Sequence, residues 1–435
     1  MWSEPRMVEH LRNLGYEVNF APPITEVKAN ITKQGYLKPN CLPVEPGVFF
    51  KVDREKPSGI NAWLIDPGLS HYRGHHYTLD TMLLKTLSPV FHHAEVLCHR
   101  SFPIELGFTP CFRASIYSYA AHTPLEAGNV IEAHGNAIFE DLCLALNDRI
   151  NQSDLILIPS ANITLLIGLR RWLESLPKHR RPIGLQMHFY TLPTHEIHGE
   201  TAQARVTQRF AEEALLLEQN FMVRWSADHS RLADWYTQLC GFEFLCIKSP
   251  HAVPEGITKI LRPDKRLRLL FIGEPRQEKG FDLILQALPN ILGKTKSCDF
   301  RFVLPDISSK IQSYLMKQLA GRVSLRVENK LPYEDYCDEI TQADYVLCIY
   351  NPEQYRLKSS GIFFEAALLN VPLIMTSGMA VEDDILDPEK VLVLPDYRPE
   401  SLMTLCLALD KKWNDQLSAT NQKSPATSMT NKSNN

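Results

Sequence analysis

Residues 355–376 read YRLKSSGIFFEAALLNVPLIMT and predict a loop, a short helix and a buried strand in succession. Ser360 and Gly361 are residue types that begin helices, and Asn370 suits the left-handed residue that ends one. Glu365 lies inside this apolar run without a basic residue three or four positions away, so a helical ion pair is excluded. It is too far from the serines for a capping box. It either complements the helix dipole or binds a ligand hydroxyl while the loop N–H groups hold phosphate.

Composition limits the classes of protein to which the chain can belong. It has 435 residues, 44% hydrophobic and 22% charged, which is enough for two or three globular domains. The net charge of −4 gives no general footprint for nucleic acid, so we expect no such partner. The ten cysteines form no Cys-x-x-Cys pair and are expected to be reduced thiols of a cytoplasmic protein. No signal peptide and no membrane-spanning apolar run is evident in the sequence.

Strand and helix patterns alternate along the chain, which favours an α/β fold with two mostly parallel sheets. The segment SPHAVPEG at 249–256 interrupts the periodicity and separates two such sets. We therefore expect a helix, strand and linker over 1–56, a first Rossmann-like domain over 57–255, a second over 256–417 and a disordered tail over 418–435. The expected strands are 16–21 in the extension, 62–65, 94–98, 154–159, 183–187, 221–225 and 243–247 in the first domain, and 267–272, 300–304, 324–327, 345–350, 371–375 and 391–394 in the second.

The loop GEPRQEKG follows the first strand of the second domain and carries two basic residues. In a parallel sheet this loop lies at the carboxyl end of the strand, where ligands bind. Beginning at Gly273, it could hold a diphosphate with Arg276 as a bidentate donor and Lys279 as a point charge. The alternative is that Glu274 and Glu278 neutralise both cations on a solvated loop.

Loops at one edge of a parallel sheet converge. The basic pair Arg276 and Lys279, the helix start at Ser360 and Gly361, and the acid Glu365 can therefore surround one ligand. Neither a P-loop nor a Gly-x-Gly-x-x-Gly fingerprint occurs in the chain. The set fits a diphosphate ester whose ribose meets Glu365.

Other polar groups lie in the first domain. His188 ends the expected strand GLQMH, where it would either bond a ligand or cap the strand. The motif HYRGHHY contains three histidines, but Gly74 argues against the helical spacing that a metal site would need, so we expect no metal there. A basic cluster forms a solvated face or could touch anionic lipid head groups; its members are Arg170, Arg171, Lys178, Arg180 and Arg181.

GEPRQEKGFDLILQAL and ADYVLCIYNPEQYRLKSSGIFFEAALLNVPLIMT, together with the two-domain layout, resemble the retaining, GT4-like group of GT-B glycosyltransferases. The resemblance is strong over 260–395 and weaker over 60–255, and it does not explain the first 50 residues. It implies two Rossmann-like domains facing across a cleft. The second would bind a nucleotide-sugar donor and the first largely the acceptor.

The resemblance also implies roles for individual residues. Arg276 and Lys279 match the basic pair of the donor domain, Glu365 matches the acid that contacts the ribose, and the small residues Ser360 and Gly361 offer backbone N–H groups to phosphate. His188 matches the strand-end histidine that contacts the donor sugar.

Two positions depart from the pattern of that group. The first acid of its Glu-x7-Glu motif, which approaches the donor sugar, would fall at Leu357. The basic residue often found directly after the loop glycine is replaced by Glu274, so its role is assigned to Arg276.

The activity implied is glycosyl transfer with retention, without a metal or other cofactor, to a glycan or lipid-linked acceptor in polysaccharide biosynthesis. Arg276, Lys279 and the start of the helix at Ser360 would stabilise the departing nucleoside diphosphate, and closure about 249–256 would exclude water. A nucleotide-sugar epimerase of the same fold is a second possibility. A non-catalytic partner is a third, favoured by Leu357 and by the N-terminal extension. The expected location is the cytoplasm, with peripheral contact at the inner membrane face through the basic cluster.

Overall fold

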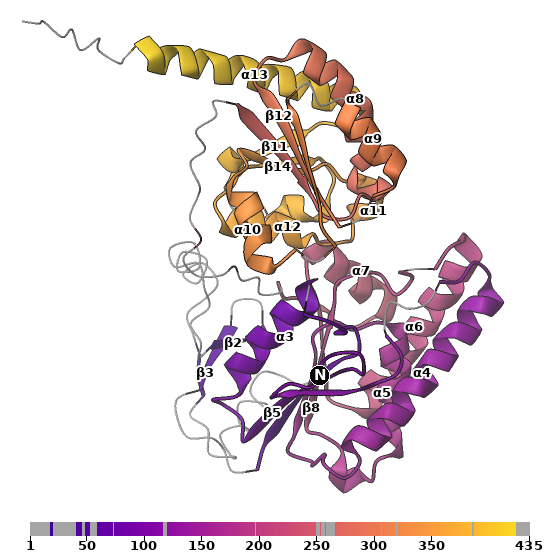
Figure 1. Cartoon of the computed structure of the whole chain (residues 1–435). Helices are drawn as coiled ribbons and strands as arrows, with labels where there is room; N and C mark the ends of the chain where they lie inside the picture. Colours follow the sequence, from indigo (N-terminus) through magenta and orange to yellow (C-terminus); the bar gives the residue numbers. More distant parts are fainter. Residues whose placement is uncertain are drawn as a thin grey trace, which may run out of the picture. The chain divides into compact units, whose positions relative to one another are not determined.

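The computed structural model describes residues 18–20, 41–45, 48–52 and 59–422, with gaps at 73, 116–119, 196, 249–252, 254–256, 258–265, 306, 318–320, 330 and 385–386. It divides into two compact units (Figure 1). The first comprises Met1–Ala252 with Leu357–Ser359, and the second comprises Val253–Arg356 with Ser360–Asn435. Most of the expected hinge at 249–256 lies outside the described residues.

In the described part of the first unit, seven strands form one parallel sheet in the order β10-β9-β8-β7-β4-β5-β6. The chain begins in the middle of the sheet at β4, builds outward to β6, then returns to the other side of β4 with β7. The strands are β4 Asn61–Asp66, β5 His93–His99, β6 Phe108–Phe112, β7 Leu155–Ile158, β8 Gly184–Phe189, β9 Val223–Ala227 and β10 Leu245–Cys246.

Helices cover both faces of this sheet, because side chains of successive strand residues point to opposite faces. Trp63 and Ile65 of β4 lie in one core with helices α4 to α7, whereas Ala62 and Leu64 lie in a second core beneath α3. Figure 1 shows α3 on one side of the strands and α4, α5 and α6 on the other. The helices are α3 Gly74–Leu87, α4 Pro124–Leu146, α5 Ile163–Ser175, α6 Glu200–Asn220 and α7 Ser230–Cys240, with a 3-10 turn η1 at Lys178–Arg180.

Among the described residues of the second unit, six strands form a parallel sheet in the order β13-β12-β11-β14-β15-β16. The order reverses between β11 and β14, and such a switch point opens a crevice at the carboxyl ends of the strands. The strands are β11 Leu267–Ile272, β12 Cys298–Leu304, β13 Val323–Val327, β14 Tyr345–Cys348, β15 Leu373–Thr376 and β16 Val391–Leu394.

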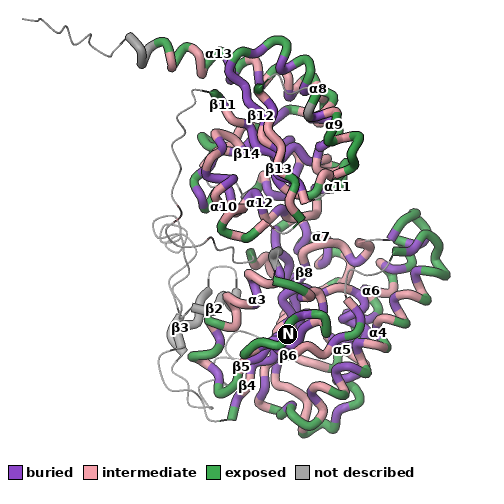
Figure 2. The backbone as a smooth tube through the Cα atoms, in the orientation of Figure 1, coloured by how far each residue is buried: buried purple, intermediate pink, exposed green. Residues whose placement is uncertain are grey.

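Two helical layers also cover the second sheet. Leu269 and Phe271 of β11 pack with α8, α9 and α13, and Leu270 and Ile272 pack with α10 and α12. Figure 2 shows these central strands as buried. The helices are α8 Phe281–Lys294, α9 Ser309–Lys317, α10 Tyr333–Thr341, α11 Pro352–Tyr355, α12 Gly361–Leu368 and α13 Pro399–Gln422, with 3-10 turns η2 Gln277–Lys279, η3 Ala380–Asp384 and η4 Pro388–Lys390.

The expectation of two Rossmann-like parallel sheets is confirmed, and each strand expected in the two domains overlaps one that forms. Asn370 has φ 60° two residues after the end of α12, in the left-handed conformation expected for the residue that ends this helix. The nine cysteines whose side chains are described are all free thiols.

Two expectations need correction. The part of 1–56 after the strand expected at 16–21 was expected to be linker, but β2 Cys41–Glu45 and β3 Val48–Val52 pair with β1 Val18–Phe20 in an antiparallel sheet. The tail was expected to begin at 418, but α13 continues to Gln422. The helix expected in the extension and residues 423–435 lie outside the described residues.

Candidate functional site

Lys279 ends the turn that follows β11, at the switch point of the second sheet. A Cβ built at Gly273 would lie 3.7 Å from its ammonium, so the chain folds back over the carboxyl end of the strand. Gly280 makes this turn possible, because its φ is +76° and a Cβ there would lie 1.8 Å from the carbonyl oxygen of Ile349. The turn is further held by a 2.8 Å hydrogen bond from Asn351 N–H to the Glu278 carbonyl oxygen.

The Lys279 side chain is half-buried, and its ammonium has no hydrogen bond or ion pair within the described part of the chain. Burial, together with the nearby charge of Arg276, lowers the pKa of Lys279 to about 8. A partly desolvated cation that makes no hydrogen bond or ion pair is unfavourable for stability. At a switch point it is well suited to an anionic ligand.

Arg276 behaves differently from Lys279. Its Nε lies 3.2 Å from Glu274 and its Nη1 lies 3.2 Å from Glu278, and 44% of its side chain is exposed. The sequence left open that Glu274 and Glu278 neutralise both cations of a solvated loop. This pairing forms at Arg276 but not at Lys279.

The start of α12 lies after β14, the strand next to β11. Ser360 is the N-cap residue, but its side chain accepts no bond from the helix and instead donates to the Tyr350 hydroxyl at 3.4 Å. The first N–H groups of the helix are thus left without a side-chain cap. A Cβ built at Gly361 would meet no atom within 4 Å, so the backbone there is open to a ligand.

Glu365 lies one turn further along α12 and is held by two tyrosines of α10. Tyr336 donates to its Oε2 at 2.8 Å and Tyr333 to its Oε1 at 3.2 Å. Burial raises the pKa of Glu365, whereas these two hydroxyls and the charge of Lys279 act in the opposite direction. The two tyrosines were not anticipated from the sequence.

In the first unit, His188 is buried at the carboxyl end of β8. The Ser226 hydroxyl donates to the Met187 carbonyl oxygen at 3.0 Å, so it accepts from His188 Nδ1, also at 3.0 Å. His188 Nε2 lies 3.7 Å from Asp228, and the ring packs edge-on against Tyr190. The ring is therefore oriented by fixed neighbours, as a binding residue requires, although a strand-end structural role gives the same contacts.

A second polar cluster occupies the switch point of the first sheet. His76 Nδ1 lies 2.5 Å from Asp66, which ends β4 and also accepts from Gly68 N–H at 2.8 Å. Asp80 is fully buried beside them, with no hydrogen-bond donor among the described residues. Burial and the charge of Asp66 raise the pKa of Asp80 well above its usual value. Within the described residues, no group of three or more His, Cys, Asp or Glu side chains is arranged to hold a metal ion.

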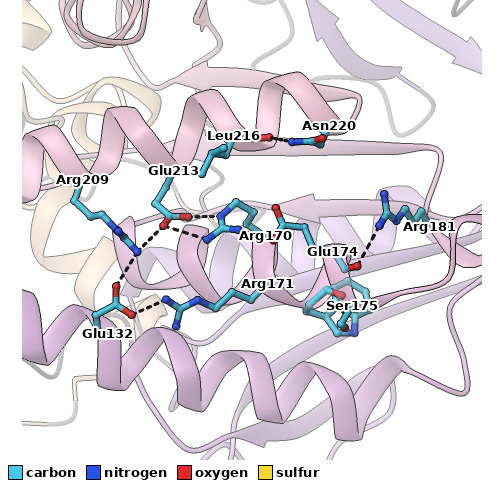
Figure 3. A network of polar contacts seen from close by, with 11 residues as sticks. Glu132, Arg170, Arg171, Glu174, Ser175, Arg181, Arg209, Glu213, Leu216 and Asn220 are labelled. Carbon is cyan, nitrogen blue, oxygen red and sulfur yellow. Dashed lines mark hydrogen bonds and ion pairs between the residues drawn. The ribbon is translucent and has the colours of Figure 1, made fainter.

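Arg170 and Arg171, which the sequence placed in a basic cluster, are paired with acids from neighbouring helices (Figure 3). Arg170 bonds buried Glu213, and Glu132 accepts from Arg171 at 2.6 Å and from Arg209 at 2.7 Å. These pairs join α4, α5 and α6. In the described part of the chain, no helix has the length and apolarity needed to span a bilayer.

Comparison with solved structures identifies the fold. Sucrose-phosphate synthase from Thermosynechococcus elongatus aligns with a TM-score of 0.55 over 81% of this chain and 90% of that chain, at 13% sequence identity. WaaG, a glycosyltransferase involved in lipopolysaccharide biosynthesis, aligns with a TM-score of 0.51 over 83% of this chain and 95% of that chain, at 14% identity. The chain has the GT-B fold.

No protein-family model and no curated protein matches the chain by sequence. At identities this low the GT-B likeness establishes the architecture alone, and the reaction has to be argued from the site. The structure brings Gly273, Lys279, Ser360, Gly361 and Glu365 to one edge of the second sheet.

Proposed function

We propose that the protein is a glycosyltransferase that binds a nucleoside-diphosphate sugar at the Lys279–Glu365 edge of the second unit. The observation that carries this proposal is the half-buried Lys279 ammonium, which makes no hydrogen bond or ion pair within the described chain and lies at the same sheet edge as an uncapped helix start. A diphosphate would supply an ion-pair partner. The ribose hydroxyls would reach Glu365 on the same helix.

Transfer requires the anomeric C–O bond of the donor to break, which leaves negative charge on the departing diphosphate. The ammonium of Lys279 and the N–H groups at the start of α12 would stabilise that charge in a partly dehydrated site, where electrostatic interactions are strong. Arg276 is already paired with two acids, so its part would be secondary unless a ligand displaces them. We propose retention of configuration and a glycan or lipid-linked acceptor, on the resemblance of 260–395 to the retaining group.

Calorimetric titration of the full chain with UDP, GDP, ADP and CMP tests the binding site. We expect one nucleotide to bind, and Lys279→Ala and Glu365→Ala each to weaken that binding at least roughly tenfold, as loss of a charge-assisted hydrogen bond would. Lys411→Ala and Glu389→Ala, which remove exposed charges of the same unit, serve as matched controls. If no nucleotide binds, or if both site variants bind as the wild type does, the proposed site is wrong.

Leu357 favours a second candidate, a protein that binds a nucleotide without transferring a sugar, because the acid expected to approach the donor sugar is missing. Slow release of nucleotide from a nucleotide sugar, with water as acceptor, would distinguish the two. Conversion of the sugar without release of nucleotide would instead identify an epimerase. If His188 acts on the donor sugar, His188→Ala should reduce the rate of nucleotide release from the nucleotide sugar more than it reduces the affinity for the nucleotide.

A further inference from the structure

The Glu365 carboxylate is held from one side by a pair of stacked tyrosines. Tyr333 and Tyr336 lie three residues apart on α10, so they project from the same face of that helix. Their ring centroids are 5.9 Å apart with an interplanar angle of 14°. Each hydroxyl bonds a different oxygen of Glu365, at 3.2 Å and 2.8 Å. This arrangement fixes the plane of the carboxylate as well as its position.

The two tyrosines use only part of the hydrogen-bond acceptor capacity of the Glu365 carboxylate. Burial and the charge of Glu365 raise the pKa of both phenols, so both hydroxyls stay protonated and donate. A carboxylate oxygen can accept two hydrogen bonds. Each oxygen of Glu365 has therefore one acceptor position filled by a tyrosine and one further position for a ligand.

The tyrosines also hold Glu365 in a position where it forms no ion pair with Lys279 in the described chain. Lys279 and Glu365 influence each other electrostatically, yet no ion pair joins them among the described residues. An untethered carboxylate in this site would either take up a proton or move toward the ammonium, because both changes relieve the penalty of burying charge. Either change would remove the acceptor for a ligand, and the second would also neutralise Lys279.

We propose that Tyr333 and Tyr336 are positioning residues that present the Glu365 carboxylate to the vicinal hydroxyls of a ribose and thereby make binding selective for ribonucleotides over 2′-deoxyribonucleotides. This inference rests on the proposed function, since it assumes a nucleoside diphosphate at this edge. A cis-diol offers two adjacent O–H donors, which match the two acceptor positions that remain on Glu365. A 2′-deoxyribose offers one and leaves a buried acceptor unmet.

The test is calorimetric titration of the full chain with UDP, GDP, ADP and CMP, with their 2′-deoxy counterparts, and with inorganic pyrophosphate. We expect the wild type to prefer the ribonucleotide at least roughly tenfold, the range for a hydrogen bond to a charged group. In Tyr336→Phe and in the Tyr333→Phe/Tyr336→Phe double variant, this preference should fall below about threefold. The affinity for pyrophosphate should change less than about twofold, because Lys279 and the start of α12 are retained.

Tyr314→Phe is the matched control, because it removes a hydroxyl that bonds the Leu285 carbonyl oxygen at 3.2 Å elsewhere in the same unit. It should leave both the preference and the pyrophosphate affinity unchanged. If the tyrosines have a purely structural role, their substitution would lower the affinities for ribonucleotide, deoxyribonucleotide and pyrophosphate by the same factor. That result overturns the inference. Equal binding of the two sugars by the wild type also overturns it while leaving the proposed function intact. Binding of none of the probes overturns both.

Discussion

Raising the pH from 7 to 9 should weaken nucleoside-diphosphate binding roughly tenfold. The ligand favours the charged form of Lys279, whose pKa is about 8 in the free protein because the ammonium is buried. If only the charged form binds, the apparent dissociation constant rises by the factor 1 + 10^(pH − pKa). This factor is about 1.1 at pH 7 and about 11 at pH 9. The last proton of a terminal phosphate is lost near pH 6, so the ligand itself changes little over this interval.

Titration calorimetry measures the effect in two independent ways. The dissociation constant is followed from pH 7 to 9, and the titration at pH 8 is repeated in buffers of different ionisation enthalpy. About half of the Lys279 side chains are neutral at pH 8, so binding should take up roughly 0.5 proton per site. In Lys279→Arg the guanidinium stays charged throughout, and any binding that remains should be independent of pH. A constant affinity and no proton uptake in the wild type would refute the assignment of Lys279 as the diphosphate ligand.

The same residue gives a prediction for stability, with the opposite sign from its effect on binding. The pKa of Lys279 in the folded chain, about 8, lies below the unperturbed 10.5, so between these values the unfolded chain binds more protons and the free energy of unfolding rises with pH. Below pH 8 the buried charge is unfavourable by up to about 3 kcal/mol. Lys279→Met should therefore raise the melting temperature at pH 7 while it lowers the affinity for the nucleoside diphosphate. A variant that loses stability and affinity together would point to a structural lysine.

Gly280→Ala should lower the free energy of unfolding, measured by urea titration, by about 3 kcal/mol or more, because its Cβ would lie 1.8 Å from the Ile349 carbonyl oxygen. The control is Gly293→Ala, whose Cβ would lie in open space on α8 and which should raise the free energy of unfolding by up to about 1 kcal/mol. Similar effects of the two alanines would contradict this. Asp80→Asn should change how stability depends on pH: burial raises the pKa of Asp80 in the folded chain, so wild-type stability falls as pH rises from about 4 to that pKa, and asparagine removes this loss. Parallel stability curves at pH 5 and 8 would show that Asp80 does not titrate beside Asp66.

The strands of both units could be predicted because a parallel sheet buried on both faces requires continuous apolar runs. The strands β6 and β3, which were not predicted, have weaker strand patterns in the sequence. β6 is an edge strand with Pro110 inside it, and proline is tolerated only at such an edge. β3 has the sequence VFFKV, directly after Pro-Gly, which is a hairpin signal. The surrounding residues are rich in lysine and proline, which weakens the strand pattern of β3 in the sequence.

The charged residues of the site were predictable individually, but their partners were not. Glu274 and Glu278 lie two residues from Arg276, so their pairing was a local alternative that the sequence kept open. Tyr333 and Tyr336 lie 32 and 29 residues from Glu365. Their contact depends on how α10 and α12 pack beneath the same face of the sheet, which is a tertiary property that no local pattern specifies.

The arrangement of charges at the edge of the second sheet supports the proposed ligand site. Arg276 is exposed and saturated by two acids, as an ordinary surface loop would be. Lys279 and Glu365 are half-buried and of opposite sign, and they form no ion pair with each other: within the described residues Lys279 makes no hydrogen bond or ion pair, and Glu365 is held by two phenols. Pairing the two, or replacing both by apolar residues, would be more stable. Because local rules of stability are most often broken at functional sites, the separation supports the proposal of a ligand that carries an anion toward Lys279 and hydroxyl donors toward Glu365. A nucleoside diphosphate has both groups. The distance between its diphosphate and its ribose hydroxyls is one that a single turn of α12 can span.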